Sequence, residues 1–221
     1  MTMGLAMILD RTVMLWADGR TCRFDSPGIP ERDDDDKIRL IGPYLAVMTS
    51  GIGLLGERVV KDMEFNYHVG LSLAQIIDLV EFCLSNCWTD MKVAEGFDVD
   101  DPNVNCGILA AGVALNQPFA FRSGCLYQKN IPTQMTNKPY QIVVSSRDSE
   151  NALAIADQVF RTEMTDELCE GTYDDYVTTV ERIGLLTMGT VAKNDSSIGG
   201  MVRCAVLKPN SIFEKKILGE I

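Results

Sequence analysis

Three side chains near the start of the chain could act together in nucleophilic chemistry: Thr2, Asp18 and Lys37. If Met1 is removed, Thr2 carries both a hydroxyl and a free α-amine. A hydroxyl is a weak nucleophile until a base takes its proton, and an α-amine with a pKa of about 8 can do so near neutral pH. A nearby lysine would lower the pKa of the hydroxyl by its positive charge, and an aspartate would hold that lysine in place. These residue types therefore suit attack on a carbonyl carbon.

The segments around these residues have the patterns of short β-strands. Residues 3–9 and 12–17 are apolar and rich in branched side chains, and Asp10-Arg11 between them predicts a hairpin. Residues 38–50 predict two more strands around Gly42-Pro43. The segment that precedes Lys37 contains prolines, a glycine and four consecutive aspartates, which predicts a solvated acidic loop over residues 23–36.

Helical periodicity follows these strands twice. The expected helices run over 55–68, over 71–89 with Ser72 as a cap, over 149–161 and over 172–193, and further strands are expected over 104–128, 141–145 and 201–207. This order differs from the strict alternation of a parallel α/β sheet. It predicts an α+β fold of four layers, with two antiparallel sheets between two helix pairs, as one domain over residues 1–221.

Composition limits the classes of function. The chain has 221 residues, of which 46% are hydrophobic, so one domain can build its own core. A net charge of −11 disfavours nonspecific binding to nucleic acid or to an anionic membrane. With seven scattered cysteines, one histidine and no CxxC pair, we expect no metal and no cofactor, and reduced thiols typical of a cytoplasmic protein. We expect no transmembrane helix and no signal peptide.

Four further motifs accompany the threonine. Ala17-Asp18-Gly19-Arg20 ends the first hairpin, and Lys37-Ile38-Arg39-Leu40-Ile41 precedes Met48-Thr49-Ser50-Gly51. Near the C-terminus, Asp195-Ser196-Ser197-Ile198-Gly199-Gly200 leads into an apolar strand. In this order the motifs resemble the proteasome family of N-terminal-nucleophile hydrolases, which includes β-type subunits of the 20S proteasome and HslV-type bacterial ring proteases. The resemblance extends over nearly the whole chain.

The resemblance implies a role for each motif. Thr2 would be the nucleophile with its own α-amine as base, and Lys37 paired with Asp18 would lower the pKa of the hydroxyl. The amide of Gly51 would stabilise the oxyanion, and Asp195 would orient the α-amine or the lysine from the far strand. Ser197 is the nearest candidate for the supporting serine of the family.

The implied function is threonine-type hydrolysis of peptide bonds. The substrate would be a peptide or an unfolded protein, and the active site would face the interior of a homo-oligomeric ring of six or seven subunits, with a regulatory ATPase or activator as partner. We expect no propeptide before Thr2, so that removal of Met1 would expose the nucleophile.

The chain also departs from the family pattern. Ile198 stands where the family has its serine, and a shift of one residue to Ser197 reverses the face of a strand. The family's G-S-G-S turn is replaced by Ser145-Ser146-Arg147-Asp148-Ser149, Cys22 replaces a small polar residue, and the loop before Lys37 is about three residues longer. Three alternatives therefore stay open: an inactive subunit that serves assembly, an amidase or transpeptidase with a specific substrate, and a binding module without activity.

Overall fold

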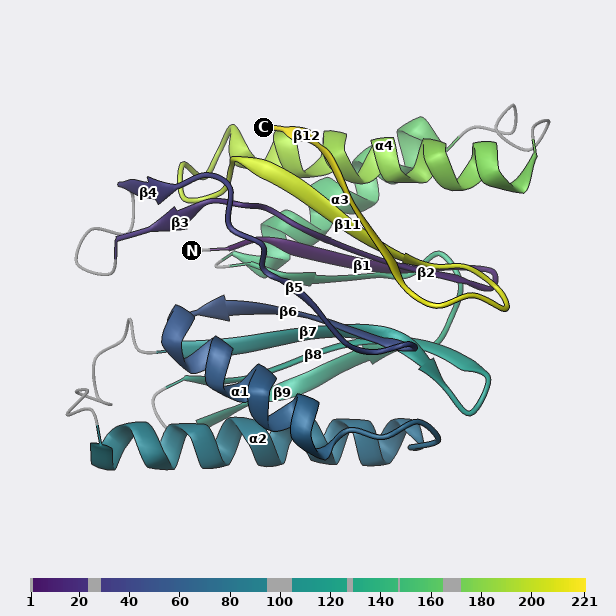
Figure 1. Ribbon diagram of the computed structural model, residues 1–221. Coiled ribbons are helices and arrows are strands. Elements are labelled where there is room, and N and C mark those ends of the chain that lie inside the picture. Colours follow the sequence, from purple (N-terminus) through teal and green to yellow (C-terminus); the bar gives the residue numbers. More distant parts are fainter. Residues whose placement is uncertain (1, 24–28, 95–104, 127–128, 147, 165–171) are drawn as a thin grey trace.

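A computed structural model describes residues 2–23, 29–94, 105–126, 129–146, 148–164 and 172–221 (Figure 1). These residues form four helices and three antiparallel sheets. The α+β class predicted from the sequence is therefore confirmed, and the helices occur as two pairs separated by strands, as expected.

The first sheet contains the N-terminal hairpin and has the strand order β10-β1-β2-β11-β12. Its strands are β1 Gly4–Leu9, β2 Thr12–Ala17, β10 Ile142–Ser145, β11 Met201–Leu207 and β12 Glu214–Glu220. The turn between β1 and β2 lies at Asp10, whose φ of 45° is a value that aspartate tolerates better than most residues. Gly4 pairs with both Ala17 and Ser145, so Thr2 and Asp18 emerge at the same end of this sheet.

The second sheet has the order β5-β6-β7-β8-β9. Its strands are β5 Ile38–Gly42, β6 Leu45–Gly51, β7 Asn105–Ala114, β8 Gln117–Leu126 and β9 Lys129–Thr136. Left-handed backbone at Leu115 and Asn116, with φ of 48° and 67°, forms the turn between β7 and β8. A small third sheet pairs β3 Thr21–Cys22 with β4 Pro30–Arg32.

The helices are α1 Gly53–Asn66, α2 Leu73–Ala94, α3 Ser149–Glu163 and α4 Tyr173–Ala192. In Figure 1, α1 and α2 cover the second sheet, α3 and α4 cover the first, and the two sheets face each other. Polar residues cap the starts of α2, α3 and α4, because they accept backbone N–H groups that lack a helical partner, whereas α1 follows Ile52 and has no side-chain cap. Ser72 accepts from the amide of Gln75 at 3.3 Å, and Thr172 and Asp175 form a capping box at α4.

Apolar side chains form three clusters, one for each contact between layers. Val59, Met63 and Val80 belong to the cluster between the first helix pair and the second sheet. Trp16 and Phe160 belong to the cluster beneath α3 and α4, and their rings meet edge to face at 6.3 Å. The cluster between the sheets uses smaller side chains, such as alanine and valine, which lets the two sheets approach closely.

Four strand segments, namely β3, β4, β9 and β12, were not predicted from the sequence. Strand β12 is largely exposed and carries glutamates and lysines, so it lacks an apolar pattern and is held by backbone pairing to β11. Strand β9 contains Pro132, which is compatible with its place at the edge of the second sheet. Strand β4 begins at Pro30 within the segment predicted as a loop. Exposed edge strands give weak sequence signals because packing does not select their side chains.

None of the helices in the described part of the chain is both apolar enough and long enough to cross a membrane.

A buried carboxylate joins α4 to β12. Glu181 is 4% exposed, and its Oε1 lies 2.5 Å from Lys216 Nζ, whose side chain is 48% exposed. Glu181 Oε1 makes no hydrogen bond among the described residues, so the ammonium is its main compensation. We expect Lys216→Met to lower the free energy of unfolding by about 2 kcal/mol, because it leaves a buried charge unpaired.

Urea denaturation of matched variants checks this expectation. Lys208→Met breaks the exposed ion pair with Asp174 and should cost less than about 1 kcal/mol. The double variant Glu181→Gln/Lys216→Met should recover part of the loss, because it removes the unpaired charge. Equal losses for Lys216→Met and Lys208→Met would show that Glu181 does not depend on its partner.

Candidate active site

Asp18 joins four segments of the chain through one carboxylate. The residue follows β2 and is 1% exposed. Its Oδ1 accepts from the backbone amide of Met3 at 2.9 Å and from Lys37 Nζ at 3.1 Å. Its Oδ2 accepts from the amides of Gly199 at 3.2 Å and Arg20 at 3.3 Å. A buried carboxylate with this many donors fixes the relative positions of β1, β2, β5 and the loop that leads into β11.

Lys37 lies immediately before β5 and points back towards the end of β2. Its side chain is 9% exposed, and its ammonium donates both to Asp18 Oδ1 and to the backbone oxygen of Arg20. The pairing of Lys37 with Asp18 that the sequence suggested is therefore present. A lysine held by a carboxylate and a carbonyl has one ammonium hydrogen left for a third partner.

Burial dominates the electrostatics of this pair. Desolvation lowers the pKa of Lys37, although the negative charge of Asp18 opposes the change. Desolvation also raises the pKa of Asp18, against the effects of the Lys37 charge and of the hydrogen bonds from Met3, Lys37 and Gly199. Each charge is therefore the buried counterion that keeps the other ionised.

Thr2 lies next to this pair. The neighbouring Met3 exchanges backbone hydrogen bonds with Asp18 in both directions, because the Asp18 amide also donates to the Met3 carbonyl at 3.2 Å. Thr2 itself is 8% exposed, so the surrounding structure encloses most of its surface. The antiparallel register of β1 and β2 thus brings the N-terminal threonine and the Asp18–Lys37 pair to one place.

The loop before β11 contacts the Asp18 carboxylate through the backbone amide of Gly199. The same loop also contains Asp195. Asp195 Oδ1 accepts from the amide and the hydroxyl of Ser197, at 2.9 and 2.6 Å. The carboxylate of Asp195 therefore serves this turn, and no described hydrogen bond links it to Thr2 or Lys37 as the resemblance had implied. Ile198 is 2% exposed and packs into the core beneath α3 and α4, which leaves the exposed Ser196 and the buried Ser197 as the hydroxyls of this loop.

Gly51 ends β6 with a left-handed φ of 92°. A Cβ at this position would meet the Asn105 backbone oxygen at 2.1 Å, so glycine is required here whatever its chemical role. The adjacent Ser50 hydroxyl lies 3.5 Å from the hydroxyl of Ser145, which pairs with Gly4. Gly51 therefore lies at the same end of the sheets as Thr2, and Ser50 and Ser145 are polar neighbours that the motif comparison did not select.

The acidic run before Lys37 is not the solvated loop that the sequence predicted. Asp33 Oδ1 lies 2.6 Å from Arg20 Nε, Asp35 binds Arg32 and the hydroxyl of Thr21, and Asp36 binds Lys215. Asp34 is exposed, and only its backbone oxygen is used, by Arg203. Three of the four carboxylates therefore attach this segment to the rest of the fold.

Arg20 links the acidic run to the loop before β11. Its Nη1 donates to the backbone oxygens of Ser196 and Ile198, at 3.1 and 3.4 Å, while its Nε binds Asp33. Its own backbone contacts both members of the Asp18–Lys37 pair. The sequence signal for this role was the arginine of the motif Ala17-Asp18-Gly19-Arg20. The partners of this arginine could not be read from the sequence.

A matched pair of substitutions tests the attachment of the acidic run. We expect Asp33→Ala to lower the free energy of unfolding by about 1–2 kcal/mol, because it removes a charge-assisted hydrogen bond from a half-buried guanidinium. Asp34→Ala should change it by less than about 0.5 kcal/mol, as is usual for exposed surface positions. Both values come from urea denaturation, and indistinguishable values would indicate that Asp33 is as solvated as Asp34.

Comparison with known proteins adds no assignment. No protein-family model matches this chain, and no curated protein matches it either. The functional conclusion therefore depends on the site itself and on the motifs that compose it.

Proposed function

We propose that this chain is an N-terminal-nucleophile hydrolase of amide bonds, with Thr2 as the nucleophile. The proposed reaction is peptide-bond cleavage, which is the activity of the proteasome family that its motifs resemble. The observation that carries the proposal is the Asp18 carboxylate, which holds both Lys37 Nζ and the amide of the residue after Thr2.

Once Met1 is removed, the proposed reaction needs only groups of this chain and water. Thr2 Oγ attacks the carbonyl carbon while its proton passes to the threonine α-amine, and the ammonium of Lys37 stabilises the developing alkoxide. The C–N bond then breaks, and the leaving amine takes the proton. Water hydrolyses the resulting ester, which releases the acid and restores the hydroxyl.

The surrounding architecture supports the same class. Two antiparallel sheets lie face to face between two helix pairs, and Thr2 emerges at the end where β1, β2 and β10 are in register. We propose that this arrangement is the four-layer sandwich of N-terminal-nucleophile hydrolases. By the same resemblance we propose assembly into a homo-oligomeric ring that takes up peptides or unfolded proteins.

The test is direct labelling of the proposed nucleophile. Protein made in cells is analysed by intact mass and N-terminal sequencing, and is then treated with a peptide epoxyketone, which reacts with the hydroxyl and the amine of an N-terminal threonine. We expect a chain that begins at Thr2 and one adduct per chain, located on Thr2 by peptide mapping. A chain with a free Thr2 that gives neither an adduct nor peptide hydrolysis would contradict the proposal.

The second candidate is an inactive subunit that keeps the fold for assembly. Two observations favour it. Ile198 is buried in the core where the family has a serine, and the Asp195 carboxylate accepts its hydrogen bonds from Ser197. The labelling experiment separates the candidates, because an inactive subunit would retain Met1 or leave the free threonine unreactive.

A further inference from the structure

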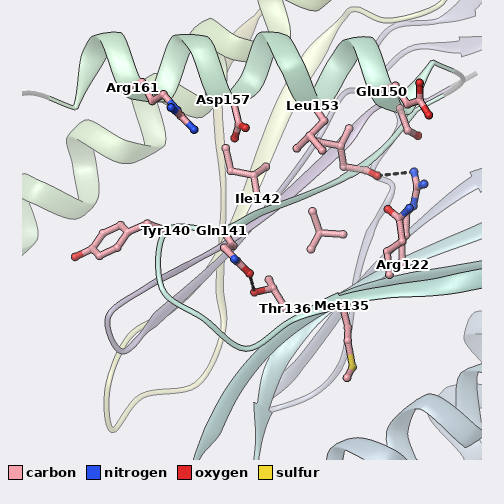
Figure 2. Close-up of a pocket in the computed structure, with 14 residues that line it drawn as sticks. Arg122, Met135, Thr136, Tyr140, Gln141, Ile142, Glu150, Leu153, Asp157 and Arg161 are labelled. Carbon is pink, nitrogen blue, oxygen red and sulfur yellow. Dashed lines mark hydrogen bonds between the residues drawn. The ribbon is translucent and has the colours of Figure 1, made fainter.

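The molecule has a second candidate site, separate from the residues of the Thr2 site. It is a cavity of about 520 Å³ between the edge strands β9 and β10 and helix α3 (Figure 2). Thr2, Asp18 and Lys37 do not line it. Its volume falls within the range of about 300–1,000 Å³ that is usual for small-molecule sites.

Arg122 is the polar group that reaches into this cavity from the second sheet. Its Nη1 donates to the Val144 backbone oxygen at 2.9 Å, and this is its one hydrogen bond among the described residues. Its Nε is buried and has no partner, and no described carboxylate forms an ion pair with it. Burial lowers the pKa of Arg122, which reflects the cost of keeping this charge out of water. The guanidinium therefore has donors and a charge that an anion could satisfy.

Apolar side chains form much of the remaining wall. Ile142 comes from β10 and Leu153 from α3, and their side chains lie near each other in Figure 2. Met135 and Tyr140, which also line it, are 62% and 56% exposed. A ligand with an apolar portion would bury this surface.

The other charged residues of the cavity are exposed and come from α3. Glu150, Asp157 and Arg161 lie along the helix, with Glu150 at the end nearer Arg122 (Figure 2). The two carboxylates disfavour a ligand with several negative charges, such as a phosphate ester. A ligand with a single negative charge placed on Arg122 is repelled less by these carboxylates.

We propose that this cavity binds an organic monocarboxylate with an apolar chain, with the carboxylate on Arg122 and the chain against Ile142 and Leu153. A free aliphatic acid and the C-terminus of a peptide share this chemistry. The site is independent of the proposed hydrolysis, because it shares no residue with the Thr2 site.

Binding of four probes tests the proposal and separates the two sources. Octanoate and N-acetyl-leucyl-leucine each carry one carboxylate, and octanamide and N-acetyl-leucyl-leucinamide are their neutral counterparts. Titration followed by amide chemical shifts should show at least one acid binding at least about tenfold more tightly than its amide, the scale expected for a charge-assisted hydrogen bond. Tighter binding of octanoate than of N-acetyl-leucyl-leucine would identify the ligand as a free aliphatic acid. Tighter binding of the dipeptide would identify it as the C-terminus of a peptide.

Two variants test the location. Arg122→Gln should remove the preference for acid over amide, and Leu153→Glu should weaken binding of the acid at least about tenfold by placing a negative charge beside it. Leu153 is 37% exposed, so this second variant is expected to fold even if Arg122→Gln does not. Leu186→Glu, on the exposed face of α4 and outside the cavity, is the matched control and should bind as the wild type does.

The proposal is overturned if neither acid binds at millimolar concentration, or if acids and amides bind equally. It is also overturned if Leu153→Glu binds the acid as tightly as Leu186→Glu does.

Discussion

Replacement of Thr2 by alanine is expected to abolish hydrolysis while the protein stays folded. The hydroxyl that would form the ester is lost, and loss of a nucleophile costs about 10⁴-fold or more in rate when the rest of the site cannot replace it. The free energy of unfolding should change by only about 1 kcal/mol, because the backbone contacts of Met3 with Asp18 remain.

Peptide-library hydrolysis and epoxyketone labelling measure this effect. Thr2→Ser is the matched control, because it keeps both the hydroxyl and the α-amine and should retain part of the activity. Intact mass must show that Met1 is removed in both variants. Activity of Thr2→Ala within twofold of the wild type would remove Thr2 from the mechanism and would favour a different site.

Replacement of Lys37 by methionine is expected to affect both activity and stability. The rate of hydrolysis should fall by about 10²–10⁴-fold, because the positive charge that assists the Thr2 hydroxyl is lost. The free energy of unfolding should fall by about 3–5 kcal/mol, because the Asp18 carboxylate is buried and would lose its ion pair with Lys37.

The double variant Asp18→Asn/Lys37→Met separates the two effects. It removes the unpaired charge while keeping a side chain that can accept hydrogen bonds, so much of the stability should return. Activity should not return, because the ammonium is still absent. Urea denaturation and peptide hydrolysis on the same samples give both quantities. Recovery of activity together with stability would show that the pair has a purely structural role.

Local patterns in the sequence predicted most of the regular structure. The apolar, branched-rich runs over residues 3–9 and 12–17 predicted the β1–β2 hairpin, and helical spacing predicted the buried faces of α1 and α2, with Ser72 as a cap. These features depend on neighbours within a few positions, so they can be read from a single sequence. Strands β9 and β12 were missed because their side chains are largely polar and their pairing depends on a partner strand.

The sequence by itself also determined which residues near the N-terminus could do chemistry, namely the threonine, the aspartate after the first hairpin and the lysine before the next strand. Only the tertiary structure decided how these groups are held. Asp18 binds Gly199, Arg20 binds Ser196, and Asp36 binds Lys215, all across more than 170 positions of the chain. Such contacts depend on the packing of whole sheets, because carboxylates bind whichever donors the fold brings near them. For this reason an acidic run that looks solvated in the sequence is bound to other parts of the chain in the structure.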